Sequence, residues 1–168
     1  MVFREFLVEA FNVMPPWMST FFLSALPFSE LRGSIPVALV IYEMNPVLAY
    51  LMAVLGNMLP VVPILLFLGP VSNSLRRFRL WDYFFTWLFE RTHKRHSEKF
   101  EKYGTLALVM FVSIPLPVTG AWTGCIASFV FGIKFRHALL AILSGVLISG
   151  IIVTSLILSG IGVVGIVN

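Results

Sequence analysis

A carboxylate and a guanidinium lie two residues apart in the segment Glu30-Leu31-Arg32-Gly33, between two apolar runs. Ionisable side chains inside a membrane segment are costly, and they commonly mark a substrate or proton site. Burial favours the neutral form of a carboxylic acid, whereas a nearby guanidinium favours its charged form. We therefore predict that Glu30 exchanges a proton while Arg32 holds a substrate anion. The alternative is an ion pair that only fixes a turn of the chain.

A second candidate segment, Leu116–Gly124, combines a Leu-Pro pair with threonines and glycines. Its hydroxyls and free backbone amides could bind an oxyanion or the waters of a cation. The alternative is structural, because Gly120 and Gly124 would permit a tight turn and Trp122 would pack. Helices that begin near Gly33 and Gly120 would direct the positive ends of their dipoles at the same cavity.

Asn57 is a polar residue within an apolar run, where its amide would bond to another helix or contact the substrate. The predicted substrate- and proton-binding residues are therefore Glu30, Arg32, Gly33, Asn57, Pro117, Thr119, Gly120, Trp122, Thr123 and Gly124.

No metal, cofactor or catalytic group is predicted from the sequence. His93 and His96 are three residues apart, but no cysteine or carboxylate completes a ligand set and basic residues surround them. No nucleophile–base arrangement, glycine-rich phosphate loop or zinc-ligand spacing occurs. The one cysteine, Cys125, cannot form an intrachain disulfide and is expected to pack as a small apolar residue. We therefore predict that the protein is not an enzyme.

The composition indicates the class of fold that carries these residues. The chain has 168 residues, of which 58% are hydrophobic and only 12% charged, whereas about a quarter of the residues of a soluble domain are charged. Two apolar runs, 46–69 and 135–161, reach the roughly 20 residues that a membrane crossing needs. The sequence therefore predicts an all-α integral membrane protein.

Two further apolar segments, 17–44 and 104–133, are interrupted by proline and by small or polar residues. Each half has about 10–12 residues and, at about 1.5 Å per residue, is too short to span the membrane. We predict that each segment is a re-entrant helical hairpin, and a single broken helix is the alternative for 17–44. Non-helical backbone at this depth is tolerated where protein or a water-filled cavity surrounds it.

The remaining segments are predicted to lie at the membrane surface. Residues 1–14 have the apolar spacing of an interfacial amphipathic helix. Residues 70–103 contain eight of the twelve basic residues and a second amphipathic helix, so we expect this segment in the cytoplasm. A nucleic-acid partner is not expected, because the basic segment is tethered between membrane segments.

The two interrupted segments share a pattern. Leu26-Pro27 is followed by Gly33, and Leu116-Pro117 by Gly124, with one long apolar run after each. We predict a single membrane domain with two repeats, 15–69 and 104–168, each a re-entrant hairpin plus one transmembrane helix. Because one crossing separates the hairpins, they would enter from opposite faces. Such inverted repeats point to a substrate site at the membrane midplane.

The stretches Glu-Leu-Arg-Gly-Ser-Ile-Pro (30–36) and Ile-Pro-Leu-Pro-Val-Thr-Gly-Ala-Trp-Thr-Gly (114–124) resemble the two signature segments of the bacterial and archaeal small multidrug export protein family. The layout is similar to that of the DedA, or VTT-domain, superfamily. The resemblance implies facing re-entrant hairpins and transport or lipid translocation, with a polyprenyl-phosphate carrier and proton coupling in DedA relatives. DedA proteins usually carry arginines in the second motif, whereas positions 113–124 hold none.

We therefore predict a small secondary transporter or lipid translocase that moves an amphiphilic, anionic, phosphate-lipid-like substrate with proton coupling. The alternatives are proton-driven efflux of lipophilic cations and a non-transporting membrane scaffold. The expected partners are membrane lipids, the substrate, protons and a second copy of the chain in a homodimer. The expected location is the plasma membrane of a bacterium or archaeon, with multiple passes.

Overall fold

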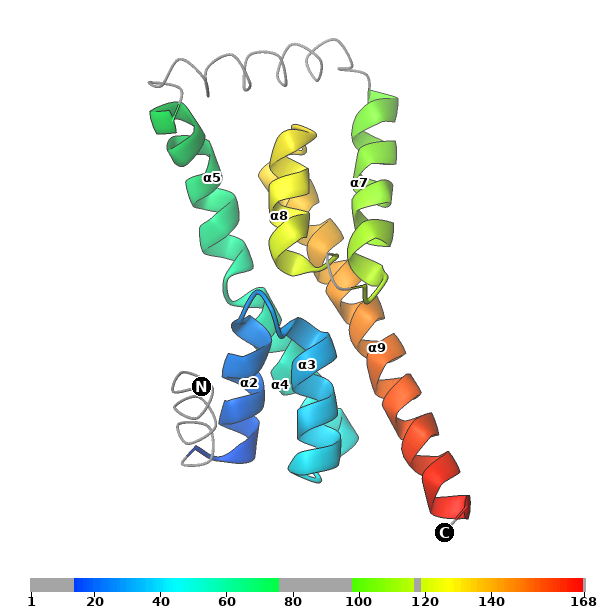
Figure 1. The fold of residues 1–168 in the computed structure, drawn as a ribbon. Coiled ribbons are helices and arrows are strands. Elements are labelled where there is room, and N and C mark those ends of the chain that lie inside the picture. The colour runs from blue at the N-terminus through cyan, green and yellow to red at the C-terminus, as the bar shows by residue number, and fades with distance from the viewer. Residues whose placement is uncertain (1–13, 76–97, 117–118, 168) are drawn as a thin grey trace. The chain divides into compact units, whose positions relative to one another are not determined.

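The computed structural model describes residues 14–75, 98–116 and 119–167, and within these it contains helices and no strand. The described elements are α2 (Pro16–Ala25), α3 (Glu30–Pro36), the π-helical turn η1 (Val37–Ile41), α4 (Pro46–Met58), α5 (Val61–Leu75), α7 (Glu98–Ser113), α8 (Ala121–Val130) and α9 (Phe135–Val167) (Figure 1). Two stretches, Pro46–Leu68 and Phe135–Gly160, are long and apolar enough to cross a membrane. The predicted all-helical membrane class is confirmed at this level.

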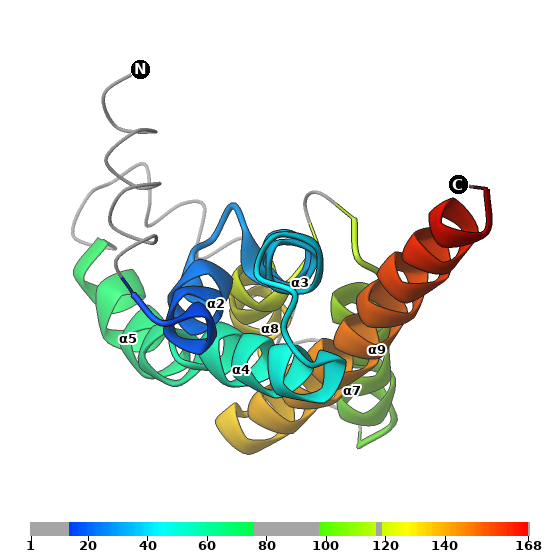
Figure 2. The ribbon, with the colours of Figure 1, turned by 90° about the horizontal axis from the view of Figure 1, so that it is seen from below.

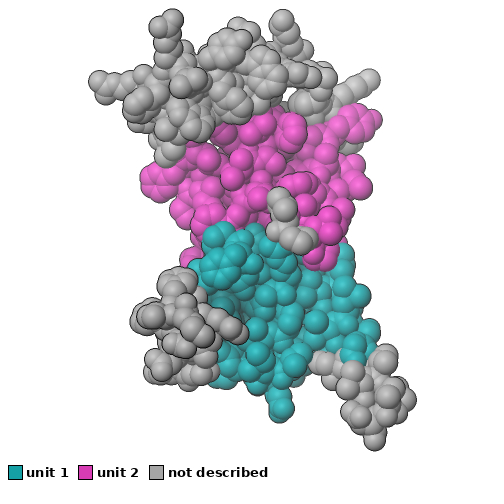
Figure 3. Space-filling view, viewed as in Figure 1, with its two compact units in different colours: residues 1–57, 149–168 teal, residues 58–148 magenta. Residues whose placement is uncertain are grey.

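The helices form two compact units, residues 1–57 with 149–168 and residues 58–148 (Figure 3). We call them unit 1 and unit 2. The first contains the first interrupted segment and the second contains the second. Re-entrant insertion and inverted symmetry of the two units stay predictions, as do the interfacial helix at residues 1–14 and most of the basic segment 70–103, which fall largely outside the described residues.

Unit 1 is a helical hairpin packed on α4. Helices α2 and α3 lie side by side (Figure 2), and α2 contacts α4. Gly56 of α4 touches the backbone of Phe21 of α2 so closely that no Cβ would fit. The Ser24 hydroxyl donates a 2.5 Å hydrogen bond to the carbonyl of Ala53 across the same contact. Small residues at helix contacts in membrane proteins let backbones approach in this way.

The C-terminal part of α9 also belongs to unit 1 and contacts α4. A Cβ on Gly150 would lie 2.7 Å from Cε2 of Tyr50 and 3.5 Å from a methyl of Val54. Tyr50 and Val54 are four residues apart, so they share one face of α4. Helix α4 therefore has two contact faces, one toward α2 and one toward α9.

The turn of the first hairpin is at residues 26–29, so the predicted break at Pro27 is confirmed and the predicted break at Glu30–Gly33 is wrong. Leu26 is extended (φ −77°, ψ 138°), which is typical of a residue before proline. Pro27 also has no N–H with which to continue α2. The charged residues do not break a helix, and Glu30 to Gly33 form the first turn of α3.

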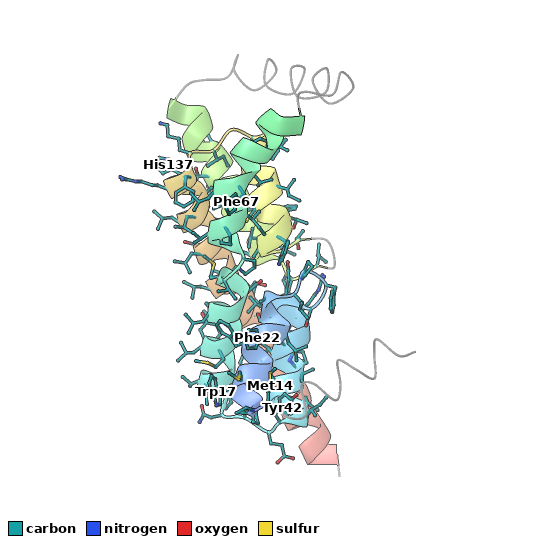
Figure 4. The ribbon with its side chains drawn as sticks, turned by 90° about the vertical axis from the view of Figure 1, so that its left-hand side faces the viewer. Met14, Trp17, Phe22, Tyr42, Phe67 and His137 are labelled. Carbon is teal, nitrogen blue, oxygen red and sulfur yellow. The ribbon has the colours of Figure 1, made fainter. Side chains whose placement is uncertain are left out.

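The π-helical turn η1 follows Pro36 directly and ends the hairpin. The Tyr42 N–H donates to the Val37 carbonyl at 3.1 Å, five residues back, and the Met44 N–H donates to Ala38 at 2.9 Å. Trp17 and Tyr42 gather with Met14 at the end of unit 1 where α2 begins (Figure 4). Tryptophan and tyrosine are enriched at membrane–water boundaries, so this end of unit 1 fits an interface.

The first candidate span, Pro46–Leu68, contains a break in its helix. Leu59 and Pro60 form a turn between α4 and α5, and the boundary between the units falls in the same stretch. Helix α5 restarts with an Ile64 N–H that donates to the Pro60 carbonyl at 3.0 Å. Helices α4 and α5 thus share the candidate span that the sequence predicted as one crossing at 46–69.

Unit 2 holds the second hairpin, α7 and α8, together with α5 and the first part of α9. A Cβ on Gly124 would lie 2.7 Å from a methyl of Val112, and one on Gly145 would lie 2.6 Å from the Val112 Cβ. Val112 of α7 is therefore enclosed by glycines of α8 and α9. Helix α7 begins at Glu98, before the predicted start of the hairpin at Gly104, so Gly104 lies inside the helix.

Candidate functional site

Glu30 is the best-defined candidate. It is the first residue of α3 and only 6% of its surface is exposed. Among the charged residues whose side chains the structure describes, it alone is buried. Its backbone has a φ of 47°, a left-handed conformation that costs a residue with a side chain about 1–2 kcal/mol. Residues held in this conformation are concentrated at functional sites.

The backbone around Glu30 is fixed by local hydrogen bonds. The Glu30 N–H donates to the Leu26 carbonyl at 3.1 Å. The Ser34 hydroxyl, which is fully buried, donates to the Glu30 carbonyl at 2.8 Å. These bonds anchor Glu30 on both sides, so its carboxyl group is presented from a rigid turn.

Arg32 and Gly33 follow in the first turn of α3. Arg32 is half-buried. Gly33 donates its N–H to the Ser29 carbonyl at 2.9 Å, and a Cβ on Gly33 would overlap the Ser29 hydroxyl. Gly33 therefore makes room for Ser29 inside the hairpin. The helix begins three residues earlier than predicted, so Gly33 is not at its N-terminus.

Asn57 is near the end of α4 in unit 1 and is 1% exposed. Its side-chain oxygen, Oδ1, has no hydrogen-bond partner in the described part of the chain. Glu30 and Asn57 lie at the same end of unit 1, because the turn between α2 and α3 and the end of α4 are at that end (Figure 1). Unit 1 therefore places two of the predicted residues at one end.

The second candidate segment belongs to unit 2, and its Thr119 holds a loop together. The Thr119 hydroxyl donates to the carbonyl of Ile114 and accepts the N–H of Leu116 at 3.1 Å. The Thr119 N–H donates to the Leu116 carbonyl at 3.2 Å. This arrangement gives the Thr119 hydroxyl a structural role in closing the loop. Pro117 lies outside the described residues.

The other residues of this segment form the start of α8. Gly120 precedes α8 with an extended backbone, and the helix begins at Ala121 as predicted. Trp122 and Thr123 are half-buried, and the Thr123 hydroxyl donates to the Gly120 carbonyl at 3.3 Å. Gly124 is a packing residue against Val112. Charge is absent from this segment, so its polar groups are the hydroxyls, the Trp122 indole N–H and the backbone.

Several buried hydroxyl residues were not singled out by the sequence analysis. Ser24 bonds α2 to α4, Ser34 bonds to Glu30, and the Ser128 hydroxyl donates to the Cys125 carbonyl at 2.7 Å. Their signal in the sequence is a serine on an otherwise apolar short helix. The Cys125 thiol is buried and donates to the Val61 carbonyl at 3.9 Å, linking α8 to α5.

The described residues contain no group of three histidine, cysteine or acidic side chains that could hold a metal ion. The polar chemistry of the described chain is thus a buried carboxylate, a guanidinium two residues away, an unpartnered amide oxygen and a set of hydroxyls. Such a set can bind charged or hydrogen-bonding groups and exchange protons.

Comparison with known proteins gives the family. No curated protein and no solved structure matches the chain. The model of one family, described as "Putative small multi-drug export protein", matches residues 30–152, nearly three quarters of the chain. The match begins at Glu30 and includes Asn57 and the segment 114–124. The chain therefore belongs to this small multidrug export family, which indicates a small membrane transporter.

Proposed function

We propose that the protein exports lipophilic cations in exchange for protons, with Glu30 as the group that binds both. The buried carboxylate of Glu30 is the observation on which the proposal rests. Membership of the small multidrug export family and two helices long enough to cross a membrane support export across a bilayer.

Burial makes Glu30 suited to this exchange. An ionised carboxylate removed from water is stabilised chiefly by a positive partner. A lipophilic cation supplies that partner at the site, and a proton neutralises the carboxylate when the cation leaves. Because one carboxylate cannot be paired with both, binding of proton and cation is mutually exclusive. This competition is what couples an outward cation to an inward proton.

The two predicted hairpins provide the path in this proposal. Each would be a re-entrant dip, and the two would face each other as an inverted repeat so that the site opens to one side of the membrane at a time. We propose a homodimer in the plasma membrane, because a chain with few crossings gains walls for a path by pairing. The cytoplasmic position of segment 70–103 belongs to the same proposal.

The test is transport by purified protein in liposomes that carry a pH gradient. Uptake of a fluorescent lipophilic cation is measured for the wild type and for Glu30→Gln, which removes the exchangeable proton and keeps the shape. We expect Glu30→Gln to lose proton-driven transport, by at least about tenfold. Glu43→Gln is the matched control, because Glu43 is also left-handed (φ 48°) but exposed, and it should transport normally.

Equal flux for the wild type and Glu30→Gln with every cation tested would refute the proposal and favour a non-transporting scaffold. Transport lost in both Glu30→Gln and Glu43→Gln would point to a general effect of charge on folding. Circular dichroism and gel filtration of each variant separate that case from a site effect.

Arg32 supports a second candidate, translocation of an anionic phosphate-lipid-like substrate. A half-buried guanidinium two residues from Glu30 suits a phosphate group. The two candidates differ in the effect of Arg32→Gln, which should abolish movement of a fluorescent phosphate lipid but leave cation export intact. The lipid assay and the cation assay are run on the same liposome preparations.

A further inference from the structure

The side-chain oxygen of Asn57 requires a partner that the described protein does not supply. Asn57 is 1% exposed, and its Oδ1 accepts no hydrogen bond from the described residues. Buried polar atoms nearly always have a partner, and an exception calls for a water, an ion or a ligand. In an apolar membrane helix the cost of leaving such an oxygen alone is larger than at a surface.

The backbone beside Asn57 adds a second acceptor. Pro60 has no N–H, so the carbonyl of Gly56 lacks the donor that a continuous helix would place four residues later. Helix α4 ends at Met58, and the end of a helix carries a partial negative charge. Oxygens at such ends of interrupted helices coordinate cations in membrane transporters.

Asn57 lies where the two contact faces of α4 meet. It is four residues beyond Ala53, which bonds to α2, and three beyond Val54, which touches α9 in unit 1. The neighbouring contact between Gly56 and Phe21 leaves no room even for a methyl group. The space beside Asn57 on the α2 side is therefore narrow, and an organic substrate does not fit that side.

We propose that the Asn57 Oδ1 and the Gly56 carbonyl bind a monovalent cation of the size of Na⁺. The acceptors named at this end of unit 1 are the amide oxygen, the backbone carbonyl at the negative end of α4 and the Glu30 carboxyl group. A cation can be bound by all of these oxygens at once, whereas one water has two hydrogens and donates to only two of them. Hard cations such as Na⁺ prefer oxygen ligands of this kind.

The test of this site does not depend on the exchange of substrate and proton proposed for Glu30, because it is made on the resting protein without transport. Thermal unfolding is measured in nanodiscs of neutral lipid, in NaCl, KCl or choline chloride at equal ionic strength. We expect NaCl at about 100 times the dissociation constant to raise the wild-type melting temperature by about 5 °C or more over choline. Binding of ²²Na⁺ to the same protein is measured in parallel.

Asn57→Leu should lose the effect of Na⁺ and the bound ²²Na⁺, while melting in choline at least as high as the wild type. Asn45→Ser is the control, since Asn45 is exposed and caps α4 by accepting the Val47 N–H at 2.9 Å, and serine keeps that role. Should Asn57→Leu fail to fold, Asn57→Asp decides: its added charge should lower the Na⁺ concentration for half-maximal effect several-fold. If the wild type melts at the same temperature in all three salts and binds no ²²Na⁺, water alone occupies the site and the proposal is overturned. A Na⁺ response that is unchanged in Asn57→Leu or Asn57→Asp would also overturn it.

Discussion

Replacing Gly56 with alanine is expected to separate α2 from α4. A Cβ at this position would lie 2.8 Å from the carbonyl carbon of Phe21 and 3.0 Å from its Cα, and closer still to its carbonyl oxygen. Carbon atoms in contact prefer a separation of about 3.5–4.0 Å. Because the obstructing atoms belong to the backbone, no change of rotamer relieves the overlap. The two helices must therefore move apart by about 0.7 Å or more.

The loss of stability follows from two contributions. Overpacking of this kind costs about 1–3 kcal/mol. The movement also stretches the hydrogen bond from Ser24 to the Ala53 carbonyl, and such bonds are worth about 0.6 kcal/mol in membrane proteins. A total of about 2–3 kcal/mol corresponds to a fall in melting temperature of roughly 5–10 °C for a chain of this size.

The assay is thermal unfolding of purified protein in a mild detergent, followed by gel filtration of the protein that remains folded. Gly160→Ala is the matched control, because Gly160 is also in a helix but would have nothing within 4 Å of an added Cβ. Alanine is the better helix former, so this control should melt at or slightly above the wild type. Melting temperatures of Gly56→Ala and Gly160→Ala that agree within about 2 °C would refute the contact between α2 and α4.

Three further outcomes follow from local geometry, each measured by the same unfolding assay. Glu43→Gly should raise the melting temperature by about 2–6 °C, because glycine removes about 1–2 kcal/mol of left-handed strain at this exposed position. A lower melting temperature would show that the Glu43 backbone is not strained. Thr119→Val should lower the melting temperature, because the 114–119 loop loses a hydrogen-bond donor and acceptor. Thr119→Ser should melt like the wild type, and an equal fall in melting temperature for both variants would contradict this role of the hydroxyl. Ser24→Ala should cost about 0.6 kcal/mol or more, and Ser144→Ala, which removes only an exposed bond to the Leu140 carbonyl, should cost less; the reverse order would contradict the α2–α4 bond.

The sequence predicted the class of element better than the place where each one begins. Apolar runs and prolines indicated two pairs of short helices and two long apolar spans, and the structure has them. The first turn was predicted to include both Pro27 and Glu30–Gly33, whereas in the structure the absent N–H of Pro27 and the extended Leu26 place it before Glu30. Backbone chemistry determines where a helix ends, and side-chain polarity does not.

At the candidate site, the sequence pattern predicted the burial of one residue, and the contacts of two others are visible only in the packed structure. The position of Glu30 in an apolar segment predicted a buried carboxylate, and the structure buries it. The role of Thr119 in closing a loop was not predicted, because its partners are backbone groups of Ile114 and Leu116 that have no signature in the sequence. The unpartnered oxygen of Asn57 required coordinates as well, since its burial depends on how α4 packs against other helices.

The two hairpins are alike in layout but unequal in charge. Glu30 lies three residues after Pro27, and Gly120 lies three residues after Pro117, so the start of α3 and the start of α8 correspond in the predicted repeat. The first start carries a buried acid on a strained backbone, and the second carries a glycine. In the export proposed above, each chain then contributes one protonatable carboxyl group from this pair of positions. One carboxyl group per chain favours the exchange of one proton for one monovalent cation. A Gly120→Glu variant that moved two protons for each transport cycle would show that these two positions set the stoichiometry.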